Sequence, residues 1–182
     1  MAMHRLAEVA VASARPTRAS WLLRQSLRMA EQCWLEPHAV VRVHGTLVAA
    51  AASPHAAIRR VEQADLALER RNVCPSCSMG FRVAATIANA RAGRLDQARR
   101  RLRGAEQIAG MWTGGGWHAA LWEARGVLRQ AEGDVTRAAA LYQEATEQFA
   151  ELGRPLDRDR CQAAARQAAG ATAMLAGPGR GG

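Results

Sequence analysis

The chain has 182 residues and a mass of 19.6 kDa, a length that fits one domain or two small ones. All 25 of its basic residues are arginine, against 16 acidic residues, which gives a formal net charge of +9. Because there is no lysine, the chain cannot carry a GxxxxGK[ST] phosphate loop, a Schiff-base or pyridoxal-phosphate site, or a protein-kinase site.

The composition favours helices throughout. Alanine, the best helix former, supplies 41 residues, whereas aromatic residues make up only 4%. The longest apolar run, residues 45–52, is far shorter than the roughly 20 residues that span a bilayer, and Glu8 interrupts the first apolar stretch of a would-be signal peptide. We therefore expect an all-α, cytoplasmic protein with no membrane partner.

Small residues interrupt the helical periodicity at a regular spacing. Ser13, Ser53, Gly93 and Gly133 each lie 40 residues after the one before, and aliphatic columns such as Leu47, Ile87 and Val127 share this phase. Apolar positions at helical spacing on both sides of a short break are typical of helical hairpins. In chain order we predict helices over 1–12, 17–33, 38–51, 54–71, 78–92, 95–109, 117–132, 135–152 and 155–170.

These helices predict one repeat domain over residues 1–170, closed by the helix at 155–170, and a flexible glycine-rich tail over 171–182. The first break falls so early that the chain starts within a repeat unit. Either the first helix is short or the product is cut from a longer protein.

The fourth unit resembles a tetratricopeptide repeat. Trp122 and Gly126 match the W and G of its first helix, and Ala138 and Tyr142 match A-x₃-F in its second. Arg125 and Arg129 depart from the pattern, and the period of 40 exceeds the usual 34. The resemblance implies a right-handed superhelical solenoid of helix-turn-helix repeats that binds proteins. The small residues Gly126, Ala138 and Ala145 would let the two helices approach closely.

In its alanine- and arginine-rich texture the chain is also similar to a segment of large actinobacterial regulators. The similarity is carried best by residues 72–84, and it is to the C-terminal repeats of signal-transduction ATPases and LuxR- or SARP-type transcription regulators. This resemblance implies a bacterial protein of transcription regulation or signal transduction. Neither the ATPase nor the DNA-reading helix-turn-helix of such regulators is present in these 182 residues.

Cys74 and Cys77 form a Cys-x-x-Cys motif that we expect in the loop entering a helix. A helix N-terminus lowers the pKa of a thiol, and such a pair also supplies two zinc ligands.

No second Cys-x-x-Cys follows, and His38 and His44 are too far apart for the usual ligand spacing. We favour an inert structural loop, with a redox-sensing pair and a metal site as alternatives. Further ligands could come only through folding, from Cys33, Cys161, His55 or His118. We assign no resident metal or cofactor, and zinc remains the alternative.

The positive charge is concentrated in residues 1–110, which hold the entire net charge of +9. Its densest cluster includes the basic patch Arg99, Arg100 and Arg103, where a phosphate or an acidic partner could bind. We favour a solvated outer face, and no aromatic residues alternate with these arginines as in single-strand binders. Direct nucleic-acid binding is therefore not expected.

We expect the first helices of the hairpins to line a groove for a partner. Its predicted lining is Val43, Leu47, Val83, Ile87 and Val127, although these residues could instead form core between helices.

The glycine-rich loop over 112–117 is expected to join the third and fourth units. No spacing typical of catalytic residues occurs, so we predict a non-enzymatic scaffold that binds a peptide or partner domain. The alternative is a sensor module with a redox- or metal-responsive Cys-x-x-Cys, and self-association remains open.

Overall fold

The computed structural model describes residues 2–111 and 116–175, and every regular element within these ranges is a helix. The elements are α1 (Ala2–Ala12), α2 (Pro16–Glu31), α3 (Glu36–Ala49), α4 (Pro54–Leu68), the 3₁₀ turn η1 (Ser76–Ser78), α5 (Met79–Arg91), α6 (Leu95–Ala109), α7 (Trp117–Ala131), α8 (Val135–Glu151) and α9 (Pro155–Leu175). The all-α prediction is confirmed. Within the described residues, none of these helices combines the length and the apolar character that a membrane crossing needs.

The helices form two compact units, Met1–Thr113 and Gly114–Gly182, where the sequence predicted one continuous repeat domain over 1–170. The boundary between the units falls in the predicted glycine-rich loop, of which residues 112–115 lie outside the described residues. The predicted tail also needs correction, because α9 continues to Leu175 and residues 171–175 are therefore helical. The rest of that tail, residues 176–182, lies outside the described residues as well.

All four predicted breaks fall between two helices. At Gly93 and Gly133 the backbone is left-handed, with φ of 72° and 87°. In both turns the next amide donates back to a carbonyl five residues earlier, so that Arg94 bonds Asn89 at 2.9 Å. This Schellman geometry ends a helix and is most readily adopted by glycine. The break at Ser53 works differently, because an extended Ser53 caps α4 by accepting a hydrogen bond from the Ala56 amide.

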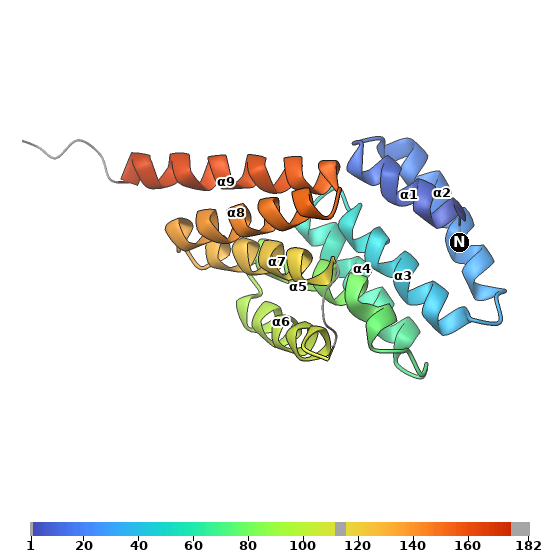
Figure 1. Cartoon of the computed structure of the whole chain (residues 1–182). Helices are drawn as coiled ribbons and strands as arrows, with labels where there is room; N and C mark the ends of the chain where they lie inside the picture. The colour runs from blue at the N-terminus through green and yellow to red at the C-terminus, as the bar shows by residue number, and fades with distance from the viewer. Residues whose placement is uncertain (1, 112–115, 176–182) are drawn as a thin grey trace, which may run out of the picture. The chain divides into compact units, whose positions relative to one another are not determined.

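Helix α3 is the centre of the first unit. Val40 and Val43 on one side of it are buried against α1 and α2. Val41 and Val48 on its other side are buried against α4 and α5. Figure 1 shows α3 between the α1–α2 hairpin and the pair α4 and α5. Helix α3 is therefore not a simple amphipathic helix with a single apolar face, because its sequence is apolar on two faces.

Gly45 allows α3 and α5 to approach very closely. A Cβ atom at position 45 would lie 2.8 Å from the Phe81 backbone nitrogen and 2.9 Å from the Gly80 carbonyl carbon. Contacts that short do not occur between real Cβ atoms and backbone, so only glycine fits at this helix crossing. The distance between these two helices thus depends on a missing side chain.

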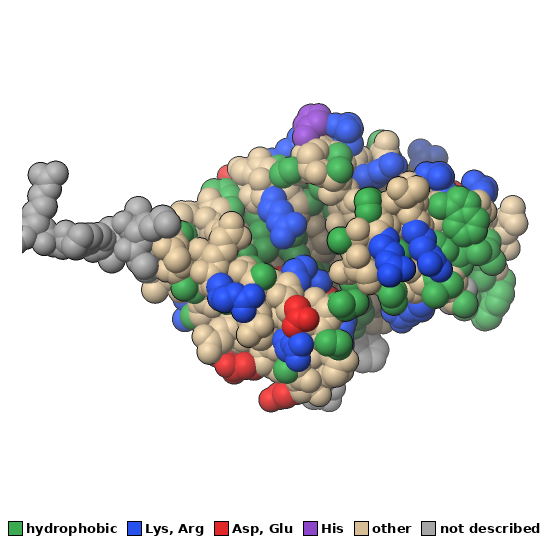
Figure 2. Space-filling model, turned by 90° about the horizontal axis from the view of Figure 1, so that it is seen from above, with side chains coloured by type: hydrophobic (Ala, Val, Ile, Leu, Met, Phe, Trp, Pro, Cys, Tyr) green, Lys and Arg blue, Asp and Glu red, His purple; other side chains and the backbone are tan. Residues whose placement is uncertain are grey.

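Several large apolar side chains of the first two helices remain exposed. Leu6 and Val9 on α1 are 53% and 56% exposed, and Trp21 and Met29 on α2 are 50% and 56% exposed. Figure 2 shows hydrophobic side chains together with arginines over this hairpin. Exposed apolar surface of this kind often marks a contact site.

In the second unit, small residues bring α7 and α8 together as the sequence predicted. Ala138 and Ala145 are fully buried, and a Cβ at Gly126 would lie 2.8 Å from the Tyr142 ring. The Tyr142 hydroxyl donates to Gln130 of α7 at 2.8 Å. The predicted role of Gly126 in close helix packing is confirmed.

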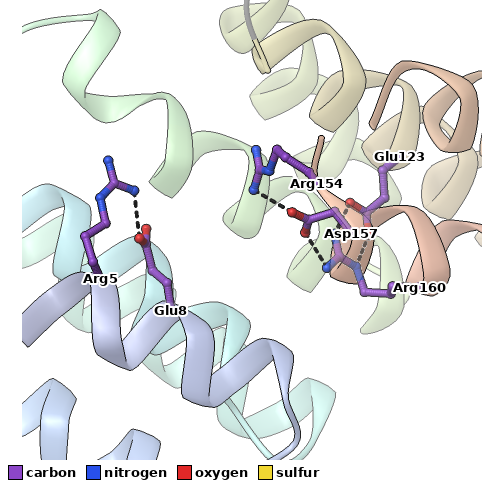
Figure 3. A network of polar contacts seen from close by, with 6 residues as sticks. All are labelled: Arg5, Glu8, Glu123, Arg154, Asp157 and Arg160. Carbon is purple, nitrogen blue, oxygen red and sulfur yellow. Dashed lines mark hydrogen bonds and ion pairs between the residues drawn. The ribbon is translucent and has the colours of Figure 1, made fainter. Parts of the chain in front are cut away.

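A charged network joins α7 to α9 (Figure 3). Arg160 donates two hydrogen bonds to the nearly buried carboxylate of Glu123, at 2.8 and 2.7 Å, and a third to Asp157 at 2.6 Å. Asp157 also pairs with Arg154 at 2.6 Å. Burial alone would lower the pKa of Arg160, but its hydrogen bonds and ion pairs with Glu123 and Asp157 raise that pKa above its ordinary value.

We predict that Gly45→Ala destabilises the first unit by about 2–3 kcal/mol, because α3 and α5 must move apart to accommodate the methyl group. Alanine is intrinsically the better helix former by about 1 kcal/mol, so the sign of the change tests the packing argument. The measurement is the free energy of unfolding in urea. The control is Gly104→Ala in α6, where the new Cβ would meet only the flexible end of Arg82, at 3.3 Å. We expect that control to be neutral or stabilising, and an equal loss in both variants would contradict the role of Gly45.

We predict that Arg160→Ala destabilises the second unit, because it leaves the Glu123 carboxylate without its bidentate partner. Breaking a fully buried pair costs about 3–5 kcal/mol, but the Arg160 side chain is 45% exposed, so we expect about 1–2 kcal/mol. In a double-mutant cycle with Glu123→Gln, the two losses should fall short of additivity. Strictly additive free energies of unfolding would show that the pair contributes nothing.

Candidate metal and thiol centre

The Cys-x-x-Cys motif lies where the sequence predicted, in the segment that enters α5. Cys74 precedes η1, Cys77 lies within it, and α5 begins directly afterwards at Met79. The Ser78 hydroxyl closes this turn by donating to the Pro75 carbonyl at 2.7 Å, and Arg82 of α5 donates to the same hydroxyl at 2.9 Å. The two thiols are therefore presented by a hydrogen-bonded turn.

The structure brings His38 to this pair. His38 lies in the first turn of α3, and one of its ring nitrogens lies within 4.8 Å of both cysteine sulfurs. The two sulfurs also lie within 4.8 Å of each other. An ion pair between Glu36 and Arg71 at 2.6 Å holds the start of α3 against the chain that leaves α4. All three side chains of the cluster are half-buried.

Sequence reasoning missed His38 as a member of this site. The spacing between His38 and His44 fits no common ligand motif, and the cysteines that His38 approaches lie 36 or more residues away along the chain. Within residues 2–111 and 116–175, the three-residue cluster does not include Cys33, His55, Cys161 or His118, the residues considered for completing the site. No local pattern indicates His38, because its approach to the cysteines depends on how α3 packs.

The two thiols differ in acidity. The pKa of Cys74 is lowered to about 7, first by a hydrogen bond from the Ser76 hydroxyl, at 3.1 Å from the sulfur, and then by the backbone amide of Cys77. The pKa of Cys77 is raised, first by burial and then by its hydrogen bond with Cys74. From the sequence, a helix N-terminus was the expected cause of a lowered thiol pKa. In the structure, local hydrogen bonds of the turn are the principal cause of the lowered pKa of Cys74.

This geometry supports two kinds of chemistry. A thiolate at Cys74 beside a second thiol can act as a nucleophile and can pair with Cys77 upon oxidation. Two thiolates and an imidazole are also ligands that bind soft and borderline metal ions. The sequence allowed both uses, and the position of His38 adds a third possible ligand for a metal ion.

The residues predicted to line a groove are mostly core. Val43, Val83 and Val127 are only 1%, 8% and 5% exposed. Leu47 and Ile87 are half-buried and retain some contact with the outside. The expected stripe along the first helices thus needs revision, because three of its five members face neighbouring helices.

Leu47 lies instead in a hollow between two turns of the first unit. The hollow has a volume of about 340 Å³ and is bounded by the α1–α2 turn and by the residues that follow α3. Its apolar residues include Val11 and Leu23, its walls are largely alanine, and Arg15 and Arg60 are its charged residues. Among the residues that the structure describes, none that lines the hollow is acidic.

The predicted basic patch on α6 is partly neutralised. Arg99 pairs with Asp96 at 2.9 Å, while Arg100 and Arg103 are exposed. Nearby, Arg94 pairs with Glu62 at 2.8 Å, which further reduces the local positive charge.

No family model, curated protein or solved structure matches the chain. What the protein does must therefore be inferred from its own residues and their geometry. The hollow and the thiol–imidazole cluster are the two features from which that inference starts.

We predict that iodoacetamide alkylates Cys74 ahead of the other described cysteines, with a rate that rises through a midpoint near pH 7 as the thiolate forms. The measurement is peptide mapping with fragmentation, which separates Cys74 from Cys77. Cys161 serves as the internal control, because burial first, and then the nearby Glu123 carboxylate, raise its pKa to about 12. A midpoint at the ordinary thiol value of about 8.5, or equal labelling of Cys77, would contradict the assignment.

Proposed function

We propose that the chain is a non-enzymatic protein-binding module built of tetratricopeptide-like helical hairpins, and that it binds an acidic amphipathic segment of a partner protein. The observation that carries this proposal is the apolar hollow in the first unit, whose charged lining residues are both arginines. A solenoid of such hairpins would present an extended surface suited to this task.

The hollow is large enough to take an anchoring side chain. Its volume of about 340 Å³ lies at the low end of the range of about 300–1,000 Å³ typical of ligand pockets. Val11, Leu23 and Leu47 supply apolar contacts for an inserted leucine or phenylalanine. Arg15 and Arg60 could pair with carboxylates on either side of that anchor.

The surrounding surface favours the same partner. Helices α1 and α2, which supply part of the lining of the hollow, also carry exposed apolar side chains that would add to the contact area. The net charge of the first 110 residues is +9, so an acidic segment would be attracted at long range and associate faster. A basic partner would be repelled by this charge.

The likeness to tetratricopeptide repeats supports the choice of a protein as the partner. The contact of Gly126 with Tyr142, and the buried Ala138, are consistent with the close hairpin packing of that family. The similarity of residues 72–84 to actinobacterial regulators supports a role in bacterial transcription regulation or signal transduction in the cytoplasm.

A second candidate function is favoured by the cluster of His38, Cys74 and Cys77. A half-buried group of two thiols and an imidazole can respond to a metal ion or to an oxidant. The chain would then be the sensor module of a regulator. Partner binding that does not change with metal or redox state would argue for the first function alone.

We predict that selection from a display library of random peptides enriches acidic amphipathic sequences. Charge reversal of the hollow, Arg15→Glu with Arg60→Glu, should weaken the binding of an enriched peptide by about 10-fold or more, because two attractive contacts become repulsive. The measurement is fluorescence anisotropy of the labelled peptide against the full chain.

The matched control for this experiment is Arg18→Glu with Arg59→Glu, which changes the net charge equally. Arg18 and Arg59 are exposed on α2 and α4 but do not line the hollow. We expect that control to weaken the affinity only slightly. Equal losses in both double variants, or enrichment of basic peptides, would overturn the proposal.

A further inference from the structure

Outside the proposed peptide-binding hollow, the first unit brings together three side chains of types that can bind a metal ion. One His38 ring nitrogen and the sulfurs of Cys74 and Cys77 all lie within 4.8 Å of one another. They come from two separate segments, the start of α3 and the turn before α5. Ligands of a tetrahedral ion are separated by distances somewhat below this value, so small side-chain movements complete the site.

We propose that His38, Cys74 and Cys77 together bind a zinc ion. Two thiolates and an imidazole are the donor set that zinc prefers, whereas calcium and magnesium require oxygen ligands. Three protein ligands fill three corners of a tetrahedron and leave one coordination position. Because all three side chains are only half-buried, that position is open to solvent or to a group from outside the site.

His38 has a second feature that points to a ligand. Its Nδ1 is shielded from solvent and has no hydrogen-bond partner in the described part of the chain. Buried polar atoms normally have a partner. Coordination of a metal ion through Nδ1 would give this nitrogen one.

The thiolate is the form of a cysteine side chain that binds zinc. The charge of a bound zinc ion would favour deprotonation of both Cys74 and Cys77, so binding would release protons and strengthen as the pH rises.

This site is separate from the peptide-binding hollow, so the two proposals can fail independently. None of His38, Cys74 and Cys77 lines the hollow. Peptide binding can be measured in the presence of a chelator, and zinc binding can be measured without any peptide.

The test uses the reduced full-length chain, stripped of metal with a chelator and titrated with Co²⁺ as a spectroscopic probe. Thiolate coordination gives sulfur-to-cobalt charge-transfer absorption in the near ultraviolet, and tetrahedral geometry gives intense visible bands. We expect both to saturate at one equivalent of Co²⁺ per chain and to disappear when Zn²⁺ displaces the cobalt. Zinc should also raise the melting temperature of the chain, since it binds the folded state.

The variant that separates this proposal from a simple thiol pair is His38→Gln. We expect it to weaken zinc binding by about 100-fold or more, because even the loss of an outer-shell partner costs about 10–100-fold. The matched control is His44→Gln, which removes an imidazole farther along the same helix that is not part of the cluster. Circular dichroism of each metal-free variant establishes that it is folded before zinc is added.

The outcomes are distinct. Loss of the cobalt spectrum in His38→Gln and in Cys74→Ser, but not in His44→Gln or Cys33→Ser, supports the three-ligand site. Equal zinc affinity in His38→Gln and the unaltered chain overturns it, because the cysteines would then bind metal without the histidine. Absence of any thiolate–cobalt absorption in the unaltered chain also overturns it and leaves Cys74 and Cys77 as a redox pair or inert thiols.

Discussion

The contact between α3 and α5 at Gly45 is the constraint on which the first unit depends. Helix α3 is buried on two sides, and at Gly45 its backbone approaches the backbone of α5 so closely that no side chain fits between them. The same close approach carries the start of α3 toward the turn that precedes α5. A histidine and two cysteines that are distant in sequence therefore share one small volume. The composition of the candidate site thus depends on how α3 packs against α5 and the turn before it.

The sequence predicted the local features of the fold and missed those that depend on tertiary contact. Helix positions, the four breaks and the close packing at Gly126 follow from periodicity and from small residues within a few turns, and the structure confirms them. Gly45 passed unnoticed within an apolar run, and His38 was set aside because its spacing fits no motif. Val43, Val83 and Val127 were placed in a groove because the apolar face of a helix looks the same whether a neighbour or a partner covers it.

All basic residues of the chain are arginine, and these arginines have different roles in different parts of the first unit. On α6 and before it, arginines pair with acidic residues of α4 more than thirty positions away, as Arg94 does with Glu62 and Arg101 with Asp65. These pairs connect successive hairpins and use up part of the positive charge. Around the hollow, the described lining residues include Arg15 and Arg60 but no carboxylate. The chain thus uses one residue type both to join its own helices and to define the charge of a surface, and the distribution of carboxylates distinguishes the two uses.

Helix α3 has a further property that follows from where its residues lie. His38 stands near its first residue and Leu47 near its last, separated by about 14 Å of continuous helix. One rigid rod therefore bears a member of the thiol–imidazole cluster at one end and part of the hollow at the other. If one proposed ligand displaced this helix on binding, the displacement would reach the residues of the other site. By thermodynamic linkage, any effect on affinity would then be equal in both directions.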